Sequence, residues 1–464
     1  MRADLRPYPE MRDSGVELLG RVPEHWAVRR LKYAVSFSGG GTPSKTNASF
    51  WKGQIPWVSP KDMTRKRISD TADHITEDAV AASAAKIVAA GAVLVVVRSG
   101  ILRRTIPVAI NTVPMAINQD MKAMLPRKGI RSEYLHGLIQ GNQSFWLSEW
   151  TKQGATVESI EHRLLADSRI PIPPLSEQRA IARFLDDADR RIRRYIRAKE
   201  RLIELLEEER RATIHEAVTG RIDVRTGQPY PAYKDSGVEW LGEVPEHWEV
   251  RRLKTLCDMR SGDTITAMSI DEVGKYRVFG GNGIRGYSSE YTHDGDYVLI
   301  GRQGALCGNV HIARGRFWAS EHAVVATLHC GHVLDWFGAA LETMNLNQYS
   351  IAAAQPGLSV DRVLHLWVPV PLAHEQGAIA RFLTAAGRRL SARRVSLARQ
   401  IALLREYRTR LIADVVTGKL DVREAAADLP ETIPLAADRD RPDVIPTEPN
   451  LHSTERDVMK EAIP

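Results

Sequence analysis

Polar side chains able to recognise DNA gather in the glycine-rich loops of two segments of this chain, residues 33–168 and 255–366. In the DNA major groove, arginine can donate two hydrogen bonds to guanine, and asparagine or glutamine can pair in the same bidentate way with adenine. Lysine and arginine also bind phosphates without reading the base. Each such residue, taken alone, is also compatible with an ordinary solvated role, so the prediction concerns the group. The candidates are Thr42, Lys45, Lys61, Arg65, Lys66, Arg67 and Arg98 in the first segment, and Asn282, Arg285, Tyr287, Arg302 and Gln303 in the second.

Motifs of nucleotide- and cofactor-binding enzymes are present only in incomplete form. Residues 39–46, GGGTPSKT, approach a phosphate-binding loop, but Ser44 stands where a glycine must precede the lysine. FGGNG at 279–283 has the glycine pattern of an S-adenosylmethionine site, yet the chain holds no NPPY-like or DPPY-like motif that would act on a flipped base. Both stretches are interpreted as turns, and no catalytic residue is assigned.

The nearest approach to a metal site is the group His329, Cys330 and His332, which lacks a second ligand pair at zinc spacing. A structural role is favoured for it, and no metal site is predicted. Glu177 and Glu375 fall at the expected starts of two helices, where the helix dipole favours an acid. Capping explains these glutamates better than acid–base catalysis.

The stretches of sequence expected to position these residues occur twice in the chain, as an internal repeat. Residues 13–32, DSGVELLGRVPEHWAVRRLK, match residues 235–254, DSGVEWLGEVPEHWEVRRLK, at 17 of 20 positions. A second pair of matching stretches begins at Pro171 and Pro369 and continues without a gap to the shared VTG and DV motifs. A repeat of this kind predicts two copies of one structural frame, with the unlike segments 33–168 and 255–366 mounted on it.

The second pair of repeats has the apolar spacing of long helices. In both copies apolar residues recur at heptad spacing after a proline-rich extended stretch, and each copy ends near a glycine, Gly220 or Gly418. About 40 helical residues would reach about 60 Å. We expect an antiparallel pair that serves as a spacer between two globular domains; two separate amphipathic helices, each buried against its own domain, are the alternative. The residues expected along this seam are Ile181, Leu185, Ala188, Ile192, Tyr195, Leu202 and Leu206 in the first helix, and Ile379, Leu383, Ala386, Leu390, Leu397, Leu404, Tyr407 and Leu411 in the second.

Short apolar runs between glycine-rich turns predict β-strands, with helical additions, in both unlike segments. The expected strands include 55–58 and 92–97 in the first segment and 276–279, 297–300 and 323–328 in the second. The longest apolar run, Ile87 to Val97, is interpreted as a buried strand because it is too short to span a bilayer.

The predicted fold class is α+β, with two mixed α/β domains joined by two long antiparallel helices that form a coiled-coil spacer in a pseudo-two-fold internal repeat. The expected domains are 1–170 (first recognition domain with the N-terminal repeated segment), 171–224 (first spacer helix), 225–368 (second recognition domain), 369–422 (second spacer helix) and 423–464 (a disordered, acidic, proline-rich tail).

The composition agrees with a DNA-binding protein. The net charge is +7, and the acidic tail leaves the rest of the chain more basic still, which suits a polyanionic partner. The three cysteines form no CxxC pair, and the N-terminus lacks the apolar core of a signal peptide. We therefore expect a cytoplasmic location and no membrane partner.

Residues 8 to 422 resemble the specificity subunits of type I restriction-modification systems. The resemblance rests on DSGVExLGxVPEHWxVRRLK, on GGTPSK with WKGQIPWVSPKDM, and on EQxAIARFL running to VTG(R/K)(I/L)DV. It implies two target-recognition domains that each read half of a bipartite DNA site, and conserved helices that dock the modification subunits. It also implies partners: double-stranded DNA, two methyltransferase subunits and the restriction subunits. S-adenosylmethionine, ATP and magnesium would bind to those subunits, and this chain would bind no cofactor.

Two other classes of protein stay open from the sequence. A chain that methylates or cleaves DNA by itself would need a cofactor motif with a catalytic partner, and the sequence shows neither. A coiled-coil scaffold without sequence preference would explain the duplicated helices but would leave the divergent, basic segments without a role. Binding all duplexes equally, with a steep salt dependence, would favour the scaffold.

Overall fold

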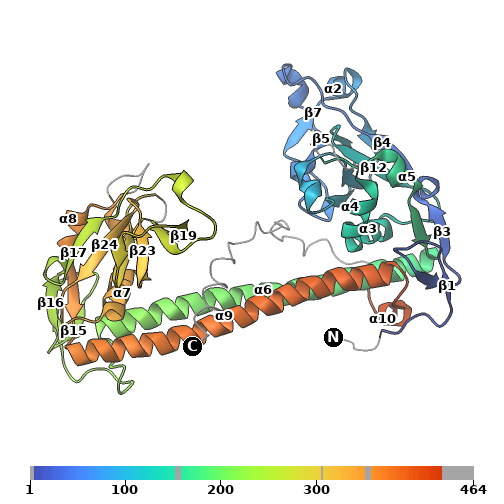
Figure 1. Cartoon of the computed structure of the whole chain (residues 1–464). Helices are drawn as coiled ribbons and strands as arrows, with labels where there is room; N and C mark the ends of the chain where they lie inside the picture. The colour runs from blue at the N-terminus through green and yellow to red at the C-terminus, as the bar shows by residue number, and fades with distance from the viewer. Residues whose placement is uncertain (1–4, 152–157, 305–306, 351–356, 431–464) are drawn as a thin grey trace. The chain divides into compact units, whose positions relative to one another are not determined.

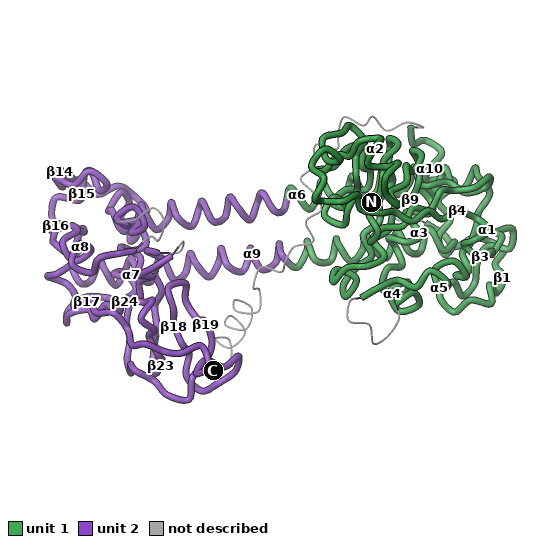
Figure 2. The backbone as a smooth tube through the Cα atoms, turned by 90° about the horizontal axis from the view of Figure 1, so that it is seen from above, with its two compact units in different colours: residues 1–198, 399–449 green, residues 199–398, 450–464 purple. Residues whose placement is uncertain are grey.

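The computed structural model describes residues 5–151, 158–304, 307–350 and 357–430, and these residues fall into two compact units (Figures 1 and 2). Unit 1 takes in the described parts of residues 1–198 and 399–449, and unit 2 takes in those of residues 199–398. Each unit contains one of the two unlike segments and part of each long helix.

The helices and strands of unit 1, apart from the two long helices, are β1 (Met11–Asp13), β2 (Arg21–Pro23), β3 (Ala27–Arg30), α1 (Leu31–Ala34), β4 (Val35–Gly39), η1 (Ala48–Trp51), β5 (Ile55–Val58), η2 (Pro60–Asp62), β6 (Arg67–Ile68), β7 (Asp73–Ile75), α2 (Glu77–Ala81), β8 (Ile87–Val88), β9 (Val93–Val96), η3 (Gly100–Arg103), β10 (Val108–Asn111), β11 (Met115–Ile117), β12 (Met121–Pro126), α3 (Ser132–Gly141), α4 (Gln143–Trp150), α5 (His162–Asp167), β13 (Arg169–Ile172) and α10 (Arg423–Ala427).

Those of unit 2 are β14 (Tyr233–Asp235), β15 (Glu243–Pro245), β16 (Glu249–Arg252), η4 (Leu253–Thr255), β17 (Cys257–Ser261), η5 (Ala267–Ser269), β18 (Tyr276–Gly280), β19 (Gly283–Ser288), β20 (His293–Asp294), β21 (Tyr297–Gly301), β22 (Val310–Ala313), β23 (Arg316–Ala319), β24 (Ala323–Leu328), α7 (Leu334–Thr343), η6 (Leu346–Tyr349), α8 (Val360–Leu364) and β25 (Trp367–Val370).

The two unlike segments have the same sheet topology. Unit 1 has an antiparallel sheet in the order β4-β12-β9-β10, extended by β6, and unit 2 has β17-β24-β21-β22 in the same arrangement. The second sheets, β7-β5-β11-β8 and β19-β18-β23-β20, also correspond, because in each the middle pair is parallel and the outer pairs are antiparallel. The structural repeat therefore extends through the two unlike segments.

Buried apolar strands form the centre of each domain. All four residues of β9 are buried, as are Val298, Leu299 and Ile300 of β21, which fits strands covered on both faces. The predicted strand at 323–328 is β24 with the same bounds, and the strands predicted at 55–58, 276–279 and 297–300 are β5, β18 and β21.

The prediction of one buried strand from Ile87 to Val97 is wrong. The run contains two strands, β8 and β9, separated by a turn at residues 90–91, and they pair in different sheets. Ile87 is 51% exposed. Apolar composition by itself cannot reveal a turn within such a run.

The predicted long helices are α6 (Leu175–Thr219) and α9 (Ala373–Val416). Within each unit they lie side by side and antiparallel (Figures 1 and 2). In unit 1, Leu185 shares a core with Ile412, and Asp189 forms an ion pair with Arg408 one turn further along. In unit 2, Leu206 packs with Leu390 and Leu397, and Arg394 Nη1 donates to Glu207 Oε1 at 2.8 Å.

Most of the predicted seam is buried between the helices or against the domains. The buried residues include Ile181, Leu185, Ile192, Leu206, Ile379 and Leu390, and Leu383 and Leu404 are partly buried. Tyr195, Leu202 and Tyr407 were predicted for the seam as well, but they are 54%, 45% and 37% exposed. Ile203 packs instead against the cluster of Leu206, Leu390 and Leu397, and Ile401 is buried, with 6% of its surface exposed. A straight α-helix turns about 20° per heptad relative to a strict seven-residue repeat, so a register extended from Ile181 no longer marks the contact face near the helix centre.

Each long helix stops at a glycine, as predicted. Gly220 and Gly418 have φ values of +75° and +78°, a left-handed conformation that closes helices. A Cβ at Gly220 would lie 2.4 Å from Pro245 Cδ, and one at Gly418 would lie 2.4 Å from Pro23 Cδ. Both prolines come from the repeated VPEHW motif, which explains why the helix ends and this motif are duplicated together.

The described part of the predicted tail is ordered. Residues 423–427 form α10, with Ala426 and the preceding Val422 fully buried, and Asp421 N donates to Arg6 O at 2.8 Å. The apolar pair and this backbone bond hold the segment on unit 1, so a disordered tail beginning at 423 does not agree with the structure. The rest of the predicted tail, from residue 431, lies outside the described residues.

Candidate nucleic-acid interface

In unit 1, the ends of β4, β5 and β9 meet the turn that joins β11 to β12. Gly41 N donates to Ile117 O at 3.0 Å, Asn118 N donates to Val58 O at 2.9 Å, and Val97 N donates to Asp120 O at 2.7 Å. We call the loops at this place, residues 40–46, 59–63, 97–100 and 118–120, the unit 1 edge.

Unit 2 builds the corresponding place from β17, β18, β21 and the turn between β23 and β24. Asp263 N donates to Ala319 O at 2.9 Å, Ser320 N donates to Phe279 O at 2.9 Å, and Arg302 N donates to His322 O at 2.9 Å. We call residues 262–266, 280–283, 302–304 and 320–322 the unit 2 edge.

A glycine lets the first loop approach the turn closely at both edges. A Cβ at Gly40 would lie 1.9 Å from Ile117 O, and one at Gly262 would lie 2.4 Å from Ala319 O. The glycines at the start of GGGTPSKT are therefore used for backbone packing. This agrees with the interpretation of that stretch as a turn and not as a phosphate-binding loop.

The predicted DNA contacts of the first segment are divided between two places. Thr42, Lys45, Lys61 and Arg98 belong to the unit 1 edge. Thr42 Oγ1 donates to Gln119 Oε1, Lys61 forms an ion pair with Asp73 at 2.7 Å, and the exposed side chains of Lys45 and Arg98 have no hydrogen bond or ion pair within the described residues.

Lys66 and Arg67 do not lie at the unit 1 edge. Lys66 forms an ion pair with Asp186 of α6, and Arg67 Nη2 lies 3.8 Å from Glu133 Oε1 of α3. The first pair joins the domain to the long helix α6 and the second lies within the domain, so the basic run of residues 65–67 is divided. Arg65 is exposed and forms no ion pair within the part of the chain that the structure describes.

In unit 2 the structure brings most of the predicted residues together. Asn282 and Gln303 are exposed at the unit 2 edge, and Asn309 Nδ2 donates to Asn282 Oδ1 at 2.7 Å. Arg302 Nη1 donates to Ser261 Oγ at 2.9 Å. Arg285 is exposed on β19 with its Cδ beside Gly280, whereas Tyr287 lies further along β19, paired with Arg277 of β18.

Two polar residues of these edges were missed by the sequence prediction. Gln119 and Glu321 precede the buried strands β12 and β24 by two residues, and both lie in the turn that every other loop of the edge contacts. Glu321 Oε2 accepts from Ile265 N at 3.3 Å. The signal available in the sequence was their position directly before a buried strand.

The repeated glutamates are structural acceptors. Glu177 accepts from Tyr8 Oη (3.1 Å) and Trp26 Nε1 (2.9 Å), and His25 Nε2 lies 2.6 Å from its other oxygen. Glu375 contacts Trp248 and His247 in the same way. Burial and the charge of Glu177 raise the pKa of Tyr8, which keeps its hydroxyl a donor. Both glutamates lie in the first turn of a long helix, as the capping prediction expects. The contacts above show that they also accept from side chains of the repeated motif, which the sequence did not predict.

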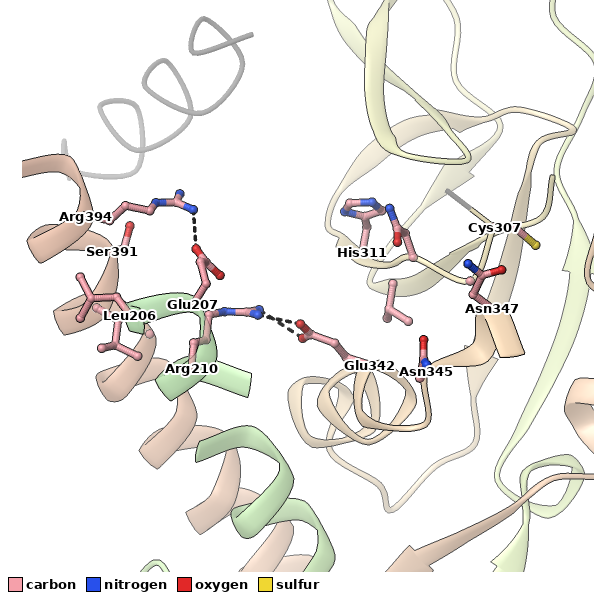
Figure 3. Close-up of a pocket in the computed structure, with 15 residues that line it drawn as sticks. Leu206, Glu207, Arg210, Cys307, His311, Glu342, Asn345, Asn347, Ser391 and Arg394 are labelled. Atoms are coloured by element: carbon pink, nitrogen blue, oxygen red, sulfur yellow. Dashed lines mark hydrogen bonds and ion pairs between the residues drawn. The ribbon is translucent and has the colours of Figure 1, made fainter. Parts of the chain in front are cut away.

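A pocket of about 670 Å³ lies within unit 2 between the helix pair and the recognition domain (Figure 3). Its charged groups bind one another: Arg210 donates twice to Glu342, at 2.7 and 3.2 Å, and Arg394 donates to Glu207. The imidazole of His311 faces the same space, and burial lowers its pKa, which favours the neutral form. The paired charges make this pocket a joint between α7 and the helices more than a ligand site.

Within the described residues no group of three or more His, Cys, Asp or Glu side chains is placed to hold a metal ion. His329 Nε2 lies 3.3 Å from Asp258 Oδ2, and His332 Nδ1 lies 3.2 Å from Gln376 Nε2. The two histidines thus have separate protein partners. Of the helices in the described ranges, none combines the length and apolar character needed to cross a membrane.

Comparison with known proteins identifies the family. The model for the type I restriction modification DNA specificity domain matches residues 23–205 and 245–396. The chain is 30% identical over 384 residues to the Escherichia coli type I restriction enzyme EcoprrI specificity subunit, covering 79% of this chain and 88% of that one. It is 43% identical over 152 residues to the Escherichia coli EcoR124I/EcoR124II specificity subunit, but this match spans only 32% of this chain and 38% of the relative.

The fold also has a solved counterpart. A chain from a structure of a type I R-M system aligns with a TM-score of 0.64 at 16% identity, covering 85% of this chain and 98% of that one. The predicted fold class and the resemblance noted in the sequence are confirmed. The matched relatives are named as specificity subunits, in agreement with the prediction of a non-catalytic recognition subunit. This chain belongs to the family of type I restriction-modification DNA specificity subunits.

Proposed function

We propose that this chain selects a bipartite, asymmetric DNA target, each half of which is read by one recognition domain at its unit 1 or unit 2 edge. The observation that carries this proposal is the pair of edges built on one strand frame but lined by different polar side chains. Asymmetry follows because unlike side chains select unlike bases.

The helix pair is assigned two tasks: setting the separation of the two half-sites and docking partner subunits. The buried seam residues hold α6 and α9 together, so docking falls to apolar residues that remain exposed. These include Tyr195, Leu205 and Leu403, which are 54%, 43% and 54% exposed. Large exposed apolar side chains on a helix favour a protein partner.

The proposed partners are two methyltransferase subunits, which would bind S-adenosylmethionine and methylate adenine, and restriction subunits, which would use ATP and magnesium to cleave DNA. This chain would direct both activities in the cytoplasm without binding a cofactor. Flipping of the target adenine would take place in the methyltransferase subunit.

The test is single-molecule methylome sequencing of a methylation-deficient host that expresses this chain with its neighbouring methyltransferase subunit. We expect one bipartite adenine-methylated motif with two different halves, absent when this chain is left out. A soluble complex that yields no motif and binds all duplexes equally would instead support the non-specific scaffold. Methyl transfer by the purified chain alone would support the self-contained methyltransferase.

A further inference from the structure

Arg98 and Gln303 occupy the same position in the two recognition domains. Val97 N donates to Asp120 O at 2.7 Å, and Arg302 N donates to His322 O at 2.9 Å. The carbonyl oxygens of the same two residues accept matching bonds: Val97 O from Ile160 N at 2.8 Å, and Arg302 O from Leu358 N at 3.0 Å. Val97 therefore corresponds to Arg302, and the residue after each is Arg98 or Gln303.

A second backbone contact supports this correspondence. Arg98 forms an isolated antiparallel bridge with Ser159, and Gln303 forms one with Gly357. The sequences VVVRSG and VLIGRQG would instead align Arg98 with Arg302. The structure excludes that alignment, because Arg302 lies one residue earlier in the hydrogen-bonding pattern.

The side chains at the shared position are exposed, and neither forms a hydrogen bond or ion pair within the described ranges. Other polar residues of the two edges form hydrogen bonds within the protein. Arg302 is bound to Ser261, Gln119 accepts from Thr42, and Glu321 accepts from Ile265 N. The backbone at the shared position is held from both sides while its side chain stays available for a base.

We propose that Arg98 and Gln303 are equivalent specificity-determining residues, Arg98 selecting guanine in one half-site and Gln303 selecting adenine in the other. This inference rests on the function proposed above. The guanidinium fork matches O6 and N7 of guanine, and the glutamine amide matches N6 and N7 of adenine. The same backbone position then delivers two different hydrogen-bonding patterns to the major groove, which makes the two half-sites unlike.

The experiment exchanges the two side chains, in R98Q and in Q303R, and determines the methylated motif of each variant complex in the host described above. We expect R98Q to lose its guanine preference at one base pair of one half-site, with a gain for adenine. Q303R is expected to change one base pair of the other half-site from adenine to guanine. The preference lost at each position should be about 5- to 150-fold, measured by competition between duplexes.

Three further variants separate base recognition from a simple effect of charge. R163Q removes an equal charge at an exposed residue of α5 that is not part of the unit 1 edge, and it should keep the wild-type motif. S289R adds an equal charge at an exposed residue of unit 2 outside its edge and should keep the motif as well. R98K retains a cation that can donate to guanine and should keep the wild-type base at the affected position.

The outcomes distinguish this inference from the proposed function. Unchanged motifs in both R98Q and Q303R, with normal methylation, would overturn the assignment of these residues and leave the proposed function intact. Absence of any motif with the wild-type chain would overturn both. If R98Q abolishes methylation, recovery of the wild-type motif by R98K supports the assignment, and a folded but equally inactive R98K rejects it.

Discussion

The indole Nε1 of Trp26 donates a hydrogen bond of 2.9 Å to Oε2 of Glu177, although 151 residues separate the two along the chain. Both side chains are buried, and Trp248 makes the equivalent bond of 3.0 Å to Glu375. The repeated PEHW segment thus supplies a donor to the first turn of the long helix in its own unit. The PEHW segment and the start of the long helix therefore depend on each other, which gives a physical reason why both occur twice in the chain.

Replacing Glu177 by alanine is expected to destabilise unit 1. The hydroxyl of Tyr8 and the indole of Trp26 would lose their acceptor in a buried place, at a cost of about 1–3 kcal/mol for each unsatisfied donor. Denaturant unfolding of the complex would measure the loss. Glu17→Ala, which removes an exposed carboxylate, is the matched control, and equal stability of the two variants would contradict the structural role of Glu177.

Gly220→Ala is expected to be more destabilising than Gly227→Ala. Both glycines have positive φ values, +75° and +73°, so each alanine pays about 1–2 kcal/mol for the left-handed backbone. The methyl group of alanine at 220 would overlap Pro245, whereas one at 227 would have no atom within 4 Å. The difference between the two melting temperatures isolates the overlap; no difference would mean that the proline moves aside freely.

Acid is expected to destabilise unit 1 through His136. Burial lowers the pKa of this histidine well below its ordinary value, so the folded state binds the proton more weakly than the unfolded state. Stability is therefore complete above about pH 6.5 and falls by about 1.4 kcal/mol for each pH unit below it, until the folded state also titrates. His136→Gln should show a shallower loss between pH 7.5 and 5.5 in denaturant unfolding, and an unchanged slope would exclude His136 as the cause.

Replacing residues 33–168 by the corresponding segment of a relative is expected to change one half of the DNA target. The other half should persist, because the unit 2 edge takes its residues from 262–322 only. The methylated motif of the chimaera checks this directly. A change in both halves would show that the two domains do not read independently.

Exposed cations of unit 1 are expected to contribute to binding strength without setting the sequence. K45A and R65A should each lower the slope of log K against log salt concentration by about 1, if each side chain contacts one phosphate. K66A removes the partner of Asp186 and should lower stability while leaving that slope unchanged. A reduced salt slope in K66A would place Lys66 at the DNA after all.

Local patterns in the sequence predicted the elements well. The long helices, their terminal glycines and the strand at 323–328 follow from heptad spacing, positive φ preference and a run of apolar residues. Each of these signals depends only on residues close together in the sequence. The prediction of the seam was wrong at Tyr195 and Leu202, because the small rotation of an α-helix relative to a strict heptad repeat accumulates along a helix of 45 residues.

Non-local pairing could not be predicted in the same way. The candidates Lys66 and Arg67 follow Arg65 directly, yet partners on α6 and α3 draw them away from the edge. The correspondence of Arg98 with Gln303 is carried by backbone hydrogen bonds that leave no trace in side-chain identity. The two unlike segments share strand order and loop ends, and these became visible only once the strands were paired.

The packing of residues 411–427 on unit 1 has a consequence for synthesis of the chain. Leu411, Val415, Val416 and Val422 belong to the same core as Trp26 and Tyr134, and Tyr134 Oη donates to Val416 O at 2.9 Å. When only the first 398 residues have been synthesised, the described part of unit 2 is complete in sequence, but this core of unit 1 still lacks residues 411–427. The first domain to be translated is therefore the last to be completed, and until then its apolar residues need protection from aggregation.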